Sequence, residues 1–162
     1  MYFSSQVGKE PPFRVVFELR PDMAPRMVEN FVKLCRGLKD GRGYEGSRLF
    51  NSKTDIYVGG GDYENNDGSG SRSAFKDREF MADRTPLKNE KGAIRMRGVD
   101  GFKGECKVGS LFHIWLGDVT DKNFRMSLVF GKVVEGLDEL IEVSRIEKTM
   151  LKTVTIVKCG TF

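Results

Sequence analysis

The sequence has few of the residues that bind metal ions or form disulfides. It contains one histidine, His113, and three cysteines that lie far apart, Cys35, Cys106 and Cys159. There is no Cys-x-x-Cys pair, and a single histidine cannot complete a zinc site of the usual kind. We therefore expect three thiols, mostly buried, in a reducing compartment, and neither a metal ion nor another cofactor.

Long hydrophobic runs and blocks of like charge are also absent. No apolar run approaches the roughly 18 residues that a transmembrane helix requires, and residues 1–5 lack the basic and apolar regions of a signal peptide. The 27 Lys and Arg residues are interspersed with 23 Asp and Glu residues, for a net charge of +4. A nucleic-acid-binding protein more often clusters its basic residues. These absences predict a cytoplasmic or nuclear protein that binds neither membranes nor nucleic acids.

The residues that are present suit one compact domain with a full core. The chain has 162 residues, of which 39% are hydrophobic and 31% are charged, and both values are ordinary for a globular protein. Short stretches rich in β-branched and aromatic residues predict strands. These stretches are residues 14–19, 56–58, 93–94, 111–116, 128–130 and 153–157.

Two segments have the spacing of apolar residues that is typical of amphipathic helices. The first begins after Asp22, the expected N-cap, has Pro25 in its first turn and ends at Gly37. The second follows Gly136, and one further turn of helix is expected near Phe80. The apolar faces consist of Met27, Phe31, Leu34 and Cys35 in the first helix and of Leu137, Leu140, Ile141 and Ile146 in the second. Many short strands with two well-separated helices predict a closed antiparallel barrel capped by the helices.

A series of motifs runs in one order along almost the whole chain. The series comprises Arg14–Leu19, Asp22, Pro25, Glu29–Phe31, Leu34–Gly37, Gly43–Ser47, Gly60–Asp62, Asp67–Gly70, Phe75–Phe80, Met96, Gly109–Ser110, Phe112, Val129–Val133, Glu135–Gly136 and Cys159–Gly160. In this order the motifs resemble those of the cyclophilins, a family of peptidyl-prolyl cis-trans isomerases.

The resemblance implies a mostly β fold, namely a closed eight-stranded antiparallel β-barrel capped by two α-helices. It implies a single domain over residues 1–162, whose first strand contains Tyr2 and Phe3. The tight trimming at both ends suggests a domain from the C-terminal end of a larger protein.

The catalytic arginine of the family has no counterpart in this sequence. The family's arginine follows a Phe-His pair a few residues after Gly-Ser, and counting back from Gly60-Gly61-Asp62 places Asn51 at its position. An amide is shorter than a guanidinium, carries no charge and cannot supply the same fork of donors. Lys53 is expected on the same side of the strand as Asn51, so partial compensation by its ammonium group stays open, whereas Arg48 should face the other way.

Other positions of the family's peptide-binding groove have also changed. Pocket positions usually filled by Phe, Met and Gln correspond to Ile56, Tyr57 and Gly59, and His113 occupies the position of a pocket phenylalanine. Phe112 matches the residue usual at its position in the family, but the resemblance implies that it faces the core. The expected degenerate groove consists of Asn51, Ile56, Tyr57, Gly59, Gly98, Val99, Leu111, Phe112, His113, Lys122, Asn123 and Ser127.

The resemblance and the substitutions together predict a cyclophilin-like domain with impaired catalysis. We expect a monomeric protein-interaction or structural module, whose partner is a protein or peptide, either a proline-containing segment or the rest of a larger parent protein. The alternative is a weak or atypical isomerase acting on Xaa-Pro bonds. A catalytic role for His113 would require a nucleophile and an orienting carboxylate, such as Asp118 or Asp121, and a packed histidine is the favoured interpretation.

Overall fold

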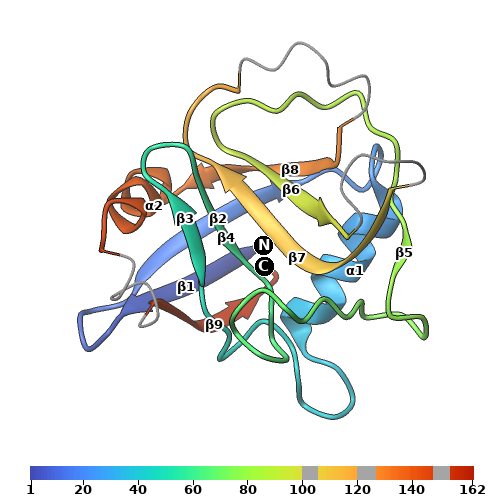
Figure 1. Cartoon of the computed structure of the whole chain (residues 1–162), viewed down its shortest axis with the longest axis horizontal. Helices are drawn as coiled ribbons and strands as arrows, with labels where there is room; N and C mark the ends of the chain where they lie inside the picture. The colour runs from blue at the N-terminus through green and yellow to red at the C-terminus, as the bar shows by residue number, and fades with distance from the viewer. Residues whose placement is uncertain (100–105, 120–126, 148–153) are drawn as a thin grey trace.

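The computed structural model describes residues 1–99, 106–119, 127–147 and 154–162. Eight strands form a curled antiparallel sheet in the order β3-β4-β7-β6-β8-β2-β1-β9 (Figure 1). A ninth, β5, pairs with β7 outside that order. The strands are β1 (Tyr2–Val7), β2 (Phe13–Leu19), β3 (Asn51–Lys53), β4 (Tyr57–Gly60), β5 (Phe80–Met81), β6 (Ala93–Gly98), β7 (Lys107–Trp115), β8 (Val129–Glu135) and β9 (Val154–Gly160), and the helices are α1 (Pro25–Arg36) and α2 (Leu137–Ser144).

Backbone hydrogen bonds join the two ends of this sheet. On one side β9 pairs with β1, from Tyr2 opposite Gly160 onwards. On its other side β9 bonds to residues 46–49, which lead into β3: the Leu49 N–H donates to the Val154 carbonyl over 2.9 Å, and the Ile156 N–H donates to the Ser47 carbonyl over 2.9 Å. The barrel is therefore closed, as the sequence predicts.

A cluster of aromatic rings lies within the core of the barrel, among aliphatic side chains. The ring of Phe31, from α1, lies 5.0 Å from that of Phe130 and 5.6 Å from that of Phe112, measured between centroids. The Tyr44 hydroxyl, also buried, donates a 2.7 Å hydrogen bond to the carbonyl of Ser110, which satisfies its polar end. Six rings make up the cluster, those of Phe3, Phe17, Phe31, Tyr44, Phe112 and Phe130.

The first helix has its expected extent but not its expected N-cap. Asp22 pairs instead with Arg20, at 2.7 Å between Oδ2 and Nη2, and the N-cap position is Ala24, which makes no side-chain cap. The helix N-terminus receives its carboxylate from elsewhere, since the Met27 N–H donates to Asp83 Oδ2 over 2.8 Å. The prediction was wrong because a nearby guanidinium takes the Asp22 carboxylate, and Asp83 lies 56 residues away along the chain.

Of the other two helical predictions, the helix after Gly136 is confirmed and the turn near Phe80 is not. The second helix follows Gly136, whose φ of 87° and close approach to the Arg14 carbonyl oxygen leave no room for a Cβ atom. The helical turn predicted near Phe80 is wrong, because Phe80 pairs with Val108 of β7. Its ring packs edge-on against that of Phe75 at 4.9 Å. Among the described residues neither helix has the length and hydrophobicity needed to cross a membrane.

Two of the three thiols are buried and adjacent. Cys159 Sγ lies 3.1 Å from the Cys35 carbonyl oxygen, and both side chains are buried. The neighbouring Cys159 thiol, together with burial, raises the pKa of Cys35. Cys106 is only partly buried.

We therefore expect a thiol reagent to modify Cys106 first. Cys35 and Cys159 should react only as the domain unfolds, because both side chains are buried away from the reagent. Mass spectrometry of the protein after timed exposure to a maleimide, with and without urea, measures the order of labelling. Modification of Cys35 at the rate of Cys106 in the folded protein would contradict this burial.

Candidate functional site

One row of positions crosses four neighbouring strands on the outside of the barrel. Asn51 of β3 lies opposite Gly59 of β4, Gly59 lies opposite His113 of β7, and His113 lies opposite Arg95 of β6. Directly opposed residues of antiparallel strands project from the same face of a sheet. The expected catalytic position and the substituted phenylalanine position are therefore parts of one surface.

The absence of a side chain at Gly59 determines how His113 packs. A Cβ atom at Gly59 would lie 2.8 Å from Cδ2 of His113, so the imidazole covers the glycine backbone. The His113 ring is stacked on that of Tyr57, with centroids 4.6 Å apart and 19° between the planes. Trp115 meets the Tyr57 ring edge-on at 6.0 Å. The surface thus carries a compact aromatic cluster.

Asn51 lies at the edge of this cluster and contacts it through one weak hydrogen bond. Its Nδ2 donates to the Tyr57 hydroxyl over 3.4 Å. Lys53 lies opposite Tyr57 in the register of β3 and β4 and is exposed. An ammonium group is thus available two residues from Asn51, on the same face of β3.

His113 is neutral at physiological pH. Burial lowers its pKa to about 4, and the positive charges of Arg95 and Arg97 act in the same direction. Asp118, one of the two carboxylates considered as its orienting partner, accepts a 3.1 Å hydrogen bond from the Lys91 N–H, and Asp121 lies outside the described residues. These facts favour the interpretation of His113 as a packed side chain over that of a catalytic base.

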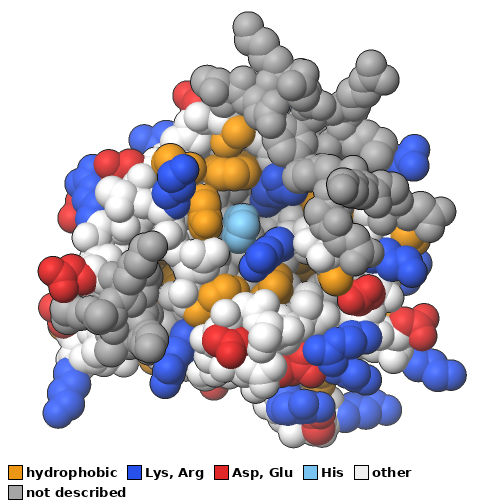
Figure 2. Space-filling view, viewed as in Figure 1, with side chains coloured by type: hydrophobic (Ala, Val, Ile, Leu, Met, Phe, Trp, Pro, Cys, Tyr) orange, Lys and Arg blue, Asp and Glu red, His pale blue; other side chains and the backbone are white. Residues whose placement is uncertain are grey.

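A cavity of about 300 Å³ lies beside the imidazole. Figure 2 shows the chain's one histidine near the centre of this face, with basic side chains close to it on two sides. The cavity is lined by Arg95, Arg97, Gly98, Val99, Cys106, His113 and Leu128.

Three of the lining residues were expected from the sequence, namely Gly98, Val99 and His113. The two arginines were missed, although a signal for them exists. In β6 the fully buried Ile94 and Met96 alternate with Arg95 and Arg97. Because side chains alternate between the faces of a strand, this pattern places both guanidinium groups on the outer face.

The other expected groove positions that the structure describes do not line the cavity. Ile56 is exposed in the turn before β4, and Leu111 and Ser127 are each only 6% exposed. Phe112 is fully buried in the aromatic core, so its side chain takes no part in the groove, in line with the orientation that the resemblance implies. Lys122 and Asn123 lie outside the described residues.

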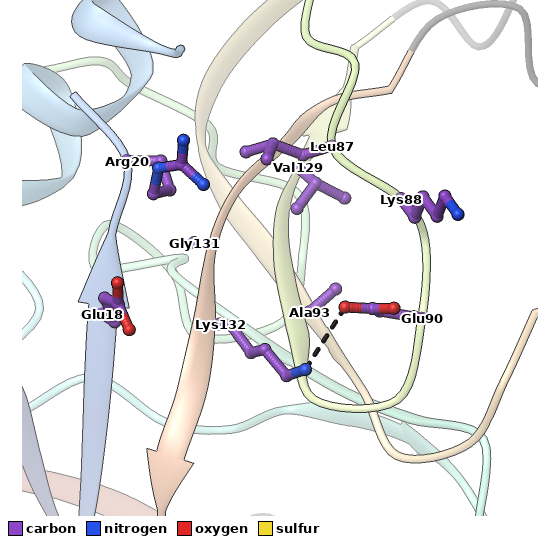
Figure 3. Close-up of a pocket in the computed structure, with 9 residues that line it drawn as sticks. All are labelled: Glu18, Arg20, Leu87, Lys88, Glu90, Ala93, Val129, Gly131 and Lys132. Atoms are coloured by element: carbon purple, nitrogen blue, oxygen red, sulfur yellow. Dashed lines mark hydrogen bonds and ion pairs between the residues drawn. The ribbon is translucent and has the colours of Figure 1, made fainter. Parts of the chain in front are cut away.

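A second cavity, of about 180 Å³, lies on another part of the barrel surface. It contains none of the expected groove residues. Figure 3 shows Lys132 of β8 pointing towards Glu90, and the two form an ion pair of 3.2 Å. Glu18 and Arg20 line the opposite side. Charges of both signs are mixed here, and they favour no single class of ligand.

The closed barrel and the motif order define a known class of protein. The family model described as cyclophilin type peptidyl-prolyl cis-trans isomerase/CLD matches residues 6–161, and the chain belongs to this family. It is 34% identical to a peptidyl-prolyl cis-trans isomerase of Encephalitozoon cuniculi over 146 residues, which are 90% of this chain and 81% of the relative. It is 28% identical to peptidyl-prolyl cis-trans isomerase B of Saccharomyces cerevisiae over 165 residues, covering 99% of this chain and 78% of the relative.

Proposed function

We propose that this cyclophilin domain binds a protein or peptide segment at the surface around His113 and has, at most, a small fraction of an ordinary cyclophilin's isomerase activity. One observation carries the proposal. Asn51, at the position where the family's arginine is expected, stands in register with Gly59 and His113, so the place where a catalytic donor would act holds a neutral amide.

The chemistry of prolyl isomerisation explains why this substitution matters. Twisting an amide must overcome a barrier of about 18–20 kcal/mol. A donor lowers the barrier only when it interacts more strongly with the twisted amide than with the planar one. The Asn51 amide lacks a positive charge and already contacts the Tyr57 hydroxyl, so it supports little of this stabilisation.

The binding half of the proposal is supported by the cavity beside His113. It is concave, has a volume of about 300 Å³ and lies on the same face as the aromatic cluster. Concave sites that combine apolar surface with a few convergent polar groups are the usual binding sites of proteins. The face therefore retains the form of a recognition site.

A weak isomerase is the second candidate, and one observation favours it. Arg97 is exposed and lines the same cavity as His113. A guanidinium group is thus present beside the groove, although it approaches from β6 and not from β3. If it acts as the donor, activity should fall in an Arg97→Gln variant.

We expect the domain to catalyse the isomerisation of a short Ala-Pro peptide at least about a hundredfold more slowly than an ordinary cyclophilin does. The loss of one transition-state donor lowers kcat by about 10²–10³-fold. NMR exchange spectroscopy at equal concentrations of the two proteins measures both rates. Asn51→Arg alone should restore little activity, because Tyr57 and His113 still shape the surface.

The rates of the wild type, Asn51→Arg and Arg97→Gln distinguish the impaired enzyme from the weak isomerase. A rate comparable with that of the ordinary cyclophilin would refute the impaired-enzyme proposal. An efficient Asn51→Arg enzyme would mean instead that the proline-binding surface is intact and that only the donor is missing. A low rate that falls further in Arg97→Gln would support the weak isomerase.

A further inference from the structure

We propose that Tyr57 sets the ligand specificity of the surface around His113. Its ring occupies the space over Gly59 that an incoming proline ring would need, so the wild-type domain does not select proline. This inference rests on the proposed binding function and names the residue that decides what the surface accepts. It follows from the row formed by Asn51, Gly59 and His113, and from the contacts by which Tyr57 spans that row.

The first step is the centre of the row. Gly59 of β4 lies opposite Asn51 of β3 on one side and opposite His113 of β7 on the other. Opposed residues share one face of a sheet, and Gly59 contributes no side chain to that face. The imidazole takes part of the space that is left, since a Cβ atom at Gly59 would lie 2.8 Å from its Cδ2.

The second step is the position of the Tyr57 ring. Tyr57 precedes Gly59 by two residues, so the two positions lie on the same face of β4. The ring is stacked on the imidazole of His113, with centroids 4.6 Å apart. Its hydroxyl accepts a 3.4 Å hydrogen bond from Nδ2 of Asn51. One side chain thus contacts the residues on both sides of Gly59 and spans the centre of the row.

The third step is how the ring is held in place. The planes of the Tyr57 and His113 rings are 19° apart, and Trp115 of β7 meets the Tyr57 ring edge-on, with 87° between the planes and 6.0 Å between the centroids. Aromatic pairs in such arrangements gain stability beyond the burial of their area. A ligand ring would have to break these contacts before it could be buried there, so Tyr57 competes with the ligand.

The fourth step is that the core does not depend on this ring. Tyr57 is half-buried on the outside of the barrel and is not part of the hydrophobic core. Figure 2 shows hydrophobic side chains directly beside the histidine on this face. Removing the Tyr57 ring should therefore change the surface and preserve the fold, so its effect on ligands can be measured alone.

The chemistry of proline makes it the ligand most affected. A proline ring has no N–H to donate and binds chiefly by burying its methylene groups. While Tyr57 covers the imidazole, a segment with proline and a segment without it make the same kind of contact with the outside of the aromatic cluster. Without the Tyr57 ring, the face of the His113 imidazole is free, and a proline ring can be buried against it.

Two blocked pentapeptides, Ala-Ala-Pro-Ala-Ala and Ala-Ala-Ala-Ala-Ala, test the proposal by NMR titration of the isotope-labelled protein. We expect the wild type to bind both with dissociation constants within about twofold of each other. Tyr57→Ala should bind the Pro peptide at least about tenfold tighter than the wild type does, and this peptide should shift the amide signals of Gly59 and His113. A tenfold gain is about 1.4 kcal/mol, less than the burial of two methylene groups contributes.

Two control variants assign the gain to the ring of Tyr57. Tyr57→Phe keeps the ring and removes the hydroxyl that contacts Asn51. Trp115→Ala removes a larger ring, which meets Tyr57 edge-on and donates a 3.0 Å hydrogen bond from Nε1 to Asn89. Both variants should bind the Pro peptide within about twofold of the wild type.

The outcomes that overturn the inference differ from those that overturn the binding function. A wild type that already prefers the Pro peptide, or a Tyr57→Ala variant without a gain, refutes the role of Tyr57 and leaves the binding function standing. An equal gain in Tyr57→Phe or in Trp115→Ala also refutes it, and so does a Tyr57→Ala chain that does not fold. If neither peptide binds to the wild type or to any variant at millimolar concentration, the inference and the proposed binding function are both wrong.

Discussion

Replacing Asp62 by asparagine should lower the free energy of unfolding by about 3–5 kcal/mol, the range expected when several charge-assisted hydrogen bonds to a buried group are lost. Asp62 follows β4 and is fully buried. Its Oδ1 accepts the N–H of Asn65 over 2.9 Å. Its Oδ2 accepts the N–H groups of Asp67, Gly68 and Gly70 over 3.2, 2.8 and 3.1 Å.

Asparagine has nearly the same size and shape as aspartate, so this variant removes the negative charge and one acceptor oxygen without changing the packing. An amide accepts only through its oxygen, so in either orientation its NH₂ group faces at least one backbone N–H donor. Burial raises the pKa of Asp62, but the four backbone N–H groups lower it by more, so that its pKa lies below the ordinary value. Its contribution is therefore present at neutral pH and is lost as the pH falls through that lowered pKa.

Urea denaturation of the wild type and of Asp62→Asn at pH 7 measures the effect. Asp67→Asn is the matched control, because Asp67 is exposed and its Oδ1 accepts hydrogen bonds from the N–H and the hydroxyl of the nearby Ser69. We expect the control to change stability by about 1 kcal/mol or less, as is usual for exposed groups. A loss below about 1 kcal/mol in Asp62→Asn would show that the loop from Asp62 to Gly70 does not depend on this carboxylate.

Acidification from pH 7 to pH 4 should remove roughly 3 kcal/mol of stability through His113 alone, at about 1.36 kcal/mol per pKa unit. The pKa is about 4 in the folded protein, against an ordinary value of 6.5. Folding therefore favours the neutral imidazole. Above pH 6.5 the contribution is complete. Between pH 6.5 and pH 4 the unfolded chain binds a proton that the folded protein does not, so stability falls with pH in that window.

The difference between wild type and His113→Phe isolates this effect from the carboxylates that titrate in the same range. Denaturation at pH 7.0, 5.5 and 4.5 should show a steeper loss in the wild type than in the variant. The NMR titration of the imidazole gives the pKa directly. A midpoint near 6.5 would mean that the ring is solvated and that neither burial nor the arginines govern its charge.

The sequence predicted the strands and helices of the barrel where the residues that favour an element lie within that element. The β-branched and aromatic residues of Arg14–Leu19 and the four apolar positions of α1 are signals that lie within the element itself, and both elements formed as expected. The N-cap at Asp22 and the helical turn at Phe80 were wrong for the opposite reason. Asp83 and β7 are distant in sequence, and tertiary contacts with them override local preference.

The candidate site was also predicted in part, and for the same reason. Asn51, Gly59 and His113 were identified one at a time from the motif order, whereas their common register across β3, β4 and β7 required the structure. Arg95 was overlooked because a buried arginine is uncommon, and a charged residue within a strand normally indicates a solvated face.

Closure of the barrel by β9 has a consequence for the synthesis of the chain. β1 and residues 46–49 are made early, yet both bond to a strand that ends at residue 160. Until β9 has left the ribosome, β1 and residues 46–49 each have an unpaired strand edge. Unpaired edges can form hydrogen bonds with strands of other chains. The domain must therefore complete its fold after residue 160 emerges, and a ribosome that stalls before β9 would release a chain prone to aggregation.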